Sequence, residues 1–156
     1  MVEMRNRPQL VGLSHLGFSV TDLDRSIEFY CDVLGATLVH GPYDGDSSSF
    51  SGRMALVMLG SNGLDLFEHA SNEGERFEPA RTGQDHLALV AESSEALQAW
   101  ADWLDAHEVP RSEIRDPGVG AMFDFVDPDG IQIEFFSTDQ ATLQKSALYS
   151  STAGSR

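Results

Sequence analysis

The chain has 156 residues, 41% hydrophobic and 9% aromatic, which is enough to build a core in one domain or two small modules. Its formal charge of −15 at pH 7 repels phosphate backbones and anionic lipids, so neither nucleic acid nor a membrane is expected as a partner. The single cysteine, Cys31, precludes an intrachain disulfide, and no apolar run approaches the roughly 18–20 residues that span a bilayer. Because no signal-peptide pattern follows the first arginines, we expect a cytoplasmic protein.

The first half of the chain predicts a strand, a helix and three further strands. The helix begins at Thr21 or Asp22, carries apolar residues at helical spacing up to Leu34 and stops at Gly35. The predicted strands cover residues 13–20, 36–40, 53–59 and 64–68. The polar segment 41–49 is predicted as a loop long enough to cover a pocket.

The second half repeats this order after a charged, aperiodic linker. The predicted elements are a strand over 86–91, a helix that is capped by Ser94 and ends near His107, a weak edge strand over 110–115 that begins with Pro110, and strands over 122–126 and 131–136. Asp127-Pro128-Asp129-Gly130 predicts a tight turn between the last two strands. Both halves thus read strand–helix–strand–strand–strand, which predicts an α+β fold made by internal duplication.

A histidine opens the first strand of each half, His15 in one copy and His86 in the other. A single histidine on a strand is ordinarily a structural residue. The equivalent positions of these two histidines in the repeat are what indicate a functional site. Glu134 lies on the last strand, on the face that also carries Gln132 and Phe136.

Three segments give the chain a resemblance to the vicinal oxygen chelate superfamily, which includes glyoxalase I, bleomycin- and fosfomycin-resistance proteins, an epimerase and extradiol dioxygenases. They are Ser14-His15-Leu16-Gly17-Phe18-Ser19-Val20 with the helix that follows, Asp85-His86-Leu87-Ala88-Leu89, and Val126-Asp127-Pro128-Asp129-Gly130-Ile131-Gln132-Ile133-Glu134. The resemblance implies two βαβββ modules that form a cup-like, partly open mixed sheet barrel. It divides the chain into an extension (1–12), a first module (13–70), a linker (71–84), a second module (85–137) and a tail (138–156).

The resemblance also implies a metal site with ligands on strands of both modules. The matching positions are His15, His86 and Glu134, and the fourth-ligand position holds Asp65. Asp65 is one methylene shorter than the glutamate common there, and the rival residue Glu68 has the opposite strand parity. Two imidazoles and a carboxylate suit one divalent ion such as Fe, Mn, Ni, Co or Zn. Glu134 is also the candidate catalytic residue, because a carboxylate there can move a proton.

Several large side chains are candidate substrate-binding residues, and ordinary core packing is the alternative for each of them. They are Tyr43, Phe67, Met122, Phe123 and Phe136. Arg53 opens a strand beside the 41–49 loop, where it holds a substrate carboxylate or is simply an exposed strand charge.

Two functional hypotheses follow. The first is a metal-dependent enzyme acting on a small oxygenated substrate that chelates the metal, by lyase or isomerase chemistry or by oxygenase chemistry. The chain has few basic residues that could bind the carboxylates of glutathione, which argues against glutathione as a substrate. The alternative is a metal-free protein that binds a small molecule or sequesters a drug. The resemblance implies a homodimer in either case.

Overall fold

The computed structural model describes residues 8–10, 12–48 and 50–137. The predicted tail, 138–156, and most of the predicted extension, 1–12, lie outside these residues. The chain divides into two compact units, one ending at Asn72 and the other beginning at Glu73. The module boundaries that the resemblance implies stay a prediction.

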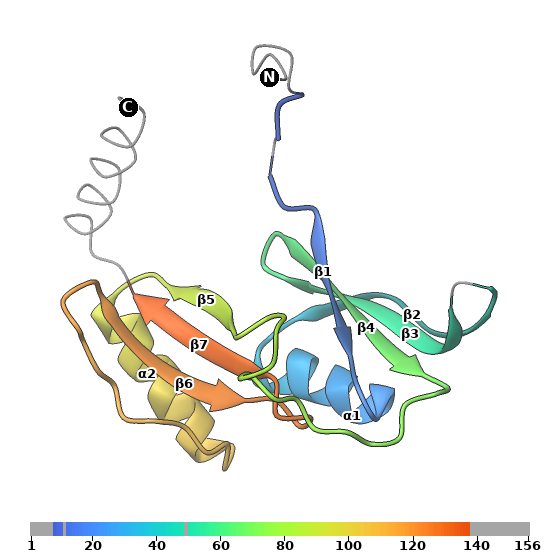
Figure 1. Ribbon diagram of the computed structural model, residues 1–156. Helices are drawn as coiled ribbons and strands as arrows, with labels where there is room; N and C mark the ends of the chain where they lie inside the picture. The colour runs from blue at the N-terminus through green and yellow to red at the C-terminus, as the bar shows by residue number, and fades with distance from the viewer. Residues whose placement is uncertain (1–7, 11, 49, 138–156) are drawn as a thin grey trace. The chain divides into compact units, whose positions relative to one another are not determined.

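The first unit is a four-stranded sheet with a helical segment against one face (Figure 1). Its elements are β1 (His15–Ser19), α1 (Leu23–Glu28), η2 (Phe29–Val33), β2 (Thr37–Asp46), β3 (Ser51–Leu59) and β4 (Asn62–His69). The strand order is β1-β4-β3-β2, with β1 parallel to β4 and the other pairs antiparallel. The mixed sheet follows from the crossover of the chain through the helix between β1 and β2.

The helical segment begins where the sequence predicts and changes geometry halfway. The Asp22 side chain accepts a hydrogen bond from the backbone N–H of Arg25, a typical N-cap. The segment continues beyond Glu28 as one π-helical turn, η2, in place of the predicted regular helix. Leu23 and Tyr30 are fully buried, and α1 packs against β3 and β4.

The prediction of a loop over 41–49 was wrong, because β2 continues through Asp46. β2 pairs with β3 from Thr37 opposite Met58 to Asp46 opposite Ser51, with register shifts around His40. Strand pairing satisfies the backbone hydrogen bonds of this polar stretch and overrides its local preference for a loop. The expected pocket-covering loop is therefore reduced to the turn between the end of β2 at Asp46 and the start of β3 at Ser51.

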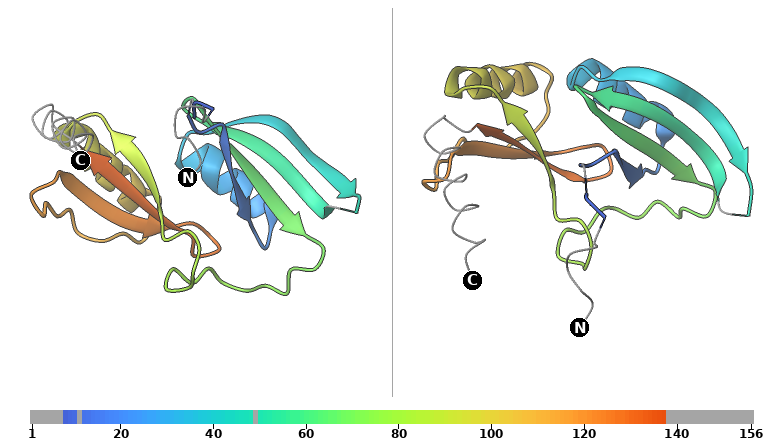
Figure 2. Two further views of the ribbon diagram at one scale, coloured as in Figure 1. Left: turned by 45° about the horizontal axis from the view of Figure 1, so that its top comes forward. Right: turned by 90° about the horizontal axis from the view of Figure 1, so that it is seen from above.

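The second unit is a three-stranded sheet with a helix along one face (Figure 2). Its elements are β5 (Leu87–Ala91), α2 (Ser94–Ala106), β6 (Ala121–Val126) and β7 (Gln132–Ser137), in the sheet order β5-β7-β6. β5 runs parallel to β7, and β6 antiparallel to it. The cap of α2 is Ser93, one residue earlier than predicted, and its Oγ accepts from the Ala96 N–H. Trp100 stacks on Phe135 with 4.5 Å between ring centroids, which ties the helix to the sheet.

The strand predicted over 110–115 was wrong as well. This segment makes two isolated bridges to β6, Arg111 with Phe125 and Arg115 with Met122. Pro110 has no N–H to donate to a ladder, and the Arg111 side chain turns back to the end of α2. The two mixed sheets, neither closed on itself, confirm the predicted α+β class. In the part of the chain that the structure describes, no helix has the length and apolar character needed to cross a membrane.

Candidate functional site

In the first unit, the sheet face away from α1 carries His15 and Asp65. Leu64 and Leu66 on β4 are buried on the helix side, so strand alternation turns Asp65 to the other face. The β1–β4 register places Gly17 opposite Asp65, and His15 precedes Gly17 by two residues on that same face. His15 Nε2 lies 3.7 Å from Asp65 Oδ2. The sheet therefore forms an imidazole–carboxylate pair.

The second unit repeats this arrangement with His86 and Glu134. Ile133 and Phe135 are buried toward α2, so Glu134 lies on the opposite face, with 13% of its side chain exposed. The β5–β7 register places Ala88 opposite Glu134, and His86 precedes Ala88 by two residues. Each unit thus offers one histidine and one carboxylate at equivalent positions of a parallel strand pair.

The residue before each histidine orients its ring. Ser14 Oγ lies 3.1 Å from His15 Nδ1, and Asp85 Oδ1 lies 2.7 Å from His86 Nδ1. A carboxylate only accepts hydrogen bonds, so Asp85 keeps the proton of a neutral His86 on Nδ1 and leaves the Nε2 lone pair available. These orienting roles were not predicted from the sequence, although the position of each residue directly before a histidine was an available signal. Such partners hold the ligand histidines of metal sites in place.

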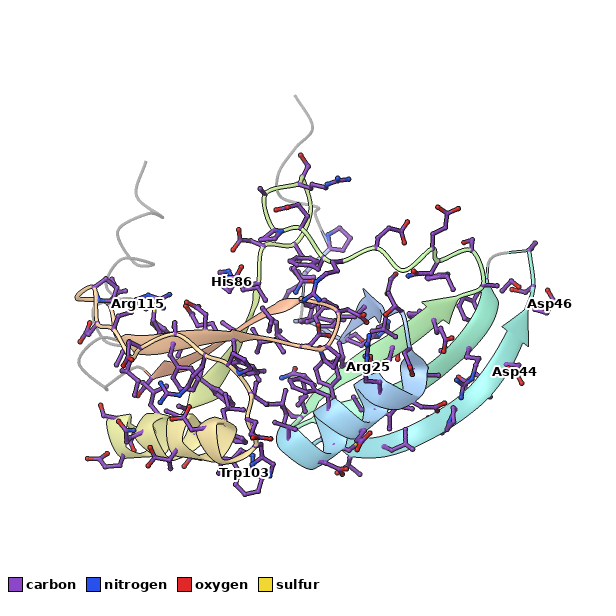
Figure 3. The ribbon with its side chains drawn as sticks, turned by 90° about the horizontal axis from the view of Figure 1, so that it is seen from below. Arg25, Asp44, Asp46, His86, Trp103 and Arg115 are labelled. Carbon is purple, nitrogen blue, oxygen red and sulfur yellow. The ribbon has the colours of Figure 1, made fainter. Side chains whose placement is uncertain are left out.

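A further pair of charged residues adjoins Glu134. Arg115 Nη1 lies 2.5 Å from Asp124 Oδ2, and Arg115 Nη2 lies 3.7 Å from Glu134 Oε2. Burial raises the pKa of Glu134 and the Asp124 charge raises it further, while His86 and Arg115 act in the opposite direction. Figure 3 shows Arg115 and His86 on the side of the sheet away from α2. Arg115 and Asp124 were not predicted from the sequence as residues of the site.

Glu68 and Arg53 belong to the helix side of the first unit. Glu68 Oε2 accepts hydrogen bonds from the Leu23 N–H at 3.1 Å and from Arg53 Nη1 at 3.3 Å. Arg53 Nη2 also lies 2.9 Å from Asp24 Oδ1. Glu68 therefore points away from Asp65, as its parity indicated. The Arg53 guanidinium therefore pairs with Asp24 of α1 and with Glu68, and not with a substrate carboxylate as considered above.

Phe67 lies on the same face as Asp65, one alternation further along β4. Its ring stacks with that of His69 at 5.9 Å, and Phe50 meets both edge-on at 5.3 Å. A cavity of about 500 Å³ opens beside this group. It is lined by Ser47, Ser48, Phe50, Ser51, His69, Ala70 and Ser71.

The other candidate substrate-binding residues differ in their placement. Met122 and Phe136 stand opposite each other in the β6–β7 register, on the same face as Glu134. Tyr43 is on β2 and is half-exposed. Phe123 is fully buried and packs against two other phenylalanines, so it is a core residue, because alternation turns it toward α2.

Over residues 8–10, 12–48 and 50–137, no three His, Cys, Asp or Glu side chains lie together as a metal-binding group. The ligand-type residues form two pairs, one in each unit. Imidazole nitrogen and carboxylate oxygen are donors that first-row divalent ions accept. The donor set fits such an ion, and its assembly from both pairs stays a prediction.

Comparisons with known proteins agree with these observations. The family model described as the Glyoxalase/Bleomycin resistance protein/Dioxygenase superfamily matches residues 12–135. The uncharacterised protein YaeR of Escherichia coli is 33% identical over 124 residues, which cover 78% of this chain and 92% of YaeR. The metallothiol transferase FosB of Staphylococcus epidermidis is 29% identical over 125 residues, covering 79% of this chain and 81% of FosB.

A solved structure with the same fold is the glyoxylase/bleomycin resistance protein/dioxygenase domain from Frankia sp. It has a TM-score of 0.75 at 26% identity and covers 85% of this chain and 95% of that domain. The family model spans almost all of the described residues and includes both histidines and Glu134. This protein therefore belongs to the glyoxalase/bleomycin resistance protein/dioxygenase superfamily, as its histidine motifs and Asp-Pro-Asp-Gly turn predicted.

Proposed function

We propose that this protein is an enzyme that uses one divalent metal ion to act on a small oxygenated substrate. Its ligands are His15, His86 and Glu134, with Asp65 as the fourth. The main support is the repeated geometry: each histidine stands two residues before the residue that pairs with the carboxylate of its unit. The relative FosB, named as a metallothiol transferase, is an enzyme of the same superfamily, which favours catalysis over simple binding.

When bound, an ion such as Fe, Mn, Ni, Co or Zn supplies Lewis-acid stabilisation of charge on two adjacent substrate oxygens, or a place to bind oxygen. The protein supplies orientation and proton transfer. Ser14 and Asp85 orient the two imidazole rings through Nδ1, and Asp85 leaves the Nε2 lone pair of a neutral His86 available. Glu134 is proposed to accept a proton from the substrate or to return one.

The substrate is proposed to lie against the apolar side chains that share the open faces with these pairs. Met122 and Phe136 flank Glu134 in the second unit, and Phe67 follows Asp65 in the first. Tyr43 is the further candidate, on β2. These side chains exclude water from one side of the substrate, which strengthens charge interactions beside them.

We also propose a homodimer. Strands β1 and β2 form the edges of the first sheet, and edge strands carry unpaired backbone groups that another chain can meet. The cytoplasmic location expected from the sequence stays a prediction.

The test is elemental analysis of untagged protein purified without chelator. Wild type is compared with His86→Ala and Glu134→Ala, and with His107→Ala as a control whose imidazole contacts Trp103 on α2. We expect about one equivalent of a transition metal per chain in wild type and control, and none in the other two variants. Iron would favour oxygenase chemistry; Zn, Ni, Co or Mn would favour lyase or isomerase chemistry.

The contrary result is a wild type that contains no metal and takes up none on reconstitution. That outcome would leave the metal-free alternative, a protein that binds a small molecule or sequesters a drug, as the better account.

A further inference from the structure

Two carboxylates face each other on the second sheet. Asp124 of β6 pairs with Glu134 of β7 in the antiparallel register, so both side chains lie on the face away from α2. Like charges directly opposite each other on a sheet repel. Glu134 is mostly buried, so water screens this repulsion only in part. The pair therefore needs a neighbouring positive charge.

Arg115 provides that charge and shares it unequally. Its Nη1 makes a short contact of 2.5 Å with Asp124, whereas its Nη2 reaches Glu134 at 3.7 Å, near the outer limit of an ion pair. A planar guanidinium with several N–H donors can engage two carboxylates at once. Glu134 is the more weakly held of the two.

Backbone hydrogen bonds to β6 fix the position of Arg115. Arg115 and Met122 exchange both backbone hydrogen bonds at 2.9 Å. Ser112 adds a second anchor: its N–H donates to the Asp124 carbonyl, and its Oγ accepts from the Asp124 N–H and from Arg115 Nη1. The guanidinium is therefore held beside both carboxylates by contacts within one unit.

We propose that Arg115 is a positioning residue that competes with the metal ion for Glu134, and that Asp124 limits this competition by holding the guanidinium. The inference rests on the proposed role of Glu134 as a metal ligand. A metal ion that binds Glu134 displaces the weaker of the two Arg115 contacts. The stronger contact, with Asp124, stays intact, so the cation moves away from Glu134 without losing all of its partners.

The two members of this ion pair should therefore change metal affinity in opposite directions. Without Arg115, Glu134 loses its competitor and the site loses a positive charge, so metal binds more tightly. Without the Asp124 charge, Arg115 pairs with Glu134 alone, so metal binds more weakly. A purely structural ion pair predicts the same direction for both variants, because either change breaks the same contact.

The experiment is a titration of the full-length protein with Co²⁺, read by visible absorption and by calorimetry. Arg115→Gln and Asp124→Asn are compared with Arg53→Gln and Asp24→Asn, which make the same charge changes in an exposed ion pair of the other unit. We expect the Co²⁺ Kd to fall about fivefold in Arg115→Gln and to rise about fivefold in Asp124→Asn. Arg53→Gln and Asp24→Asn should change the Co²⁺ Kd by less than about twofold. Arg115→Lys, which keeps the charge, should stay within about twofold of wild type.

The inference is overturned if the Co²⁺ Kd changes in the same direction in Arg115→Gln and Asp124→Asn, or changes no more than in Arg53→Gln and Asp24→Asn. Either result leaves the proposed metal site in place. A wild type that binds no Co²⁺ overturns this inference together with the proposed function. Circular dichroism checks that each variant folds. If Arg115→Gln does not fold, the change of the Co²⁺ Kd in Asp124→Asn alone tests the inference. A Kd that falls or stays unchanged in that variant refutes the competition between Arg115 and the metal ion.

Discussion

Replacing Glu68 with alanine is expected to destabilise the first unit and to leave metal binding unchanged. The Glu68 carboxylate accepts a hydrogen bond from the Leu23 N–H, at the first residue of α1. Losing such a hydrogen bond at a helix N-terminus costs about 0.5–2 kcal/mol. The partly exposed contact with Arg53 adds at most about 1 kcal/mol, and Arg53 keeps its pairing with Asp24. We therefore expect the free energy of unfolding to fall by about 1–2 kcal/mol.

Urea denaturation followed by circular dichroism measures this change as a lower midpoint at an unaltered slope. Glu68→Gln keeps an acceptor oxygen and should recover part of the loss. Asp65→Ala is the matched change on the other face of β4: the free energy of unfolding should move by less than about 0.5 kcal/mol, while metal affinity falls. If Glu68→Ala lost metal and kept its stability, Glu68 would be the fourth ligand and the assignment of faces on β4 would be wrong.

Three other changes test the packing and electrostatics. Phe123→Ala, which empties a fully buried position, should lower the free energy of unfolding by about 3–5 kcal/mol in urea denaturation; a loss below about 1 kcal/mol would contradict its place in the core. Gly52→Ala should destabilise the β3–β4 end, because Gly52 has a φ of +143° and an added Cβ would overlap the Glu68 carbonyl oxygen; hydrogen exchange should be faster there than in wild type. The hydrogen bond from Arg53 holds the pKa of Asp24 below its usual 3.8; this stabilisation is complete above that value and is lost as the pH falls through the lower folded-state pKa. The free energy of unfolding, measured as a function of pH, should therefore fall toward acid pH, and it should fall less in Arg53→Gln than in wild type.

Local sequence features determined most elements of the two sheets. Alternation between two faces identified β1 and β7, and apolar runs bounded by turns identified β3, β4, β5 and β6. The cap at Asp22 and the stop at Gly35 bounded the first helical segment. These features act through neighbours in the chain, so they can be read without knowing the fold. The duplication identified His15 and His86 as equivalent, because equivalent positions in a repeat need only the spacing of the motif.

Only the tertiary structure decided what each face meets. β2 extends through a polar Gly-Pro stretch because β3 supplies its hydrogen bonds. Met122 and Phe123 are adjacent and both buried, yet Met122 shares a face with Glu134 and Phe123 lies on the face toward α2. Arg115 reaches Asp124 and Glu134 through a strand register that joins residues distant in the chain. Register and face depend on pairing between separate segments, and no local pattern encodes that pairing.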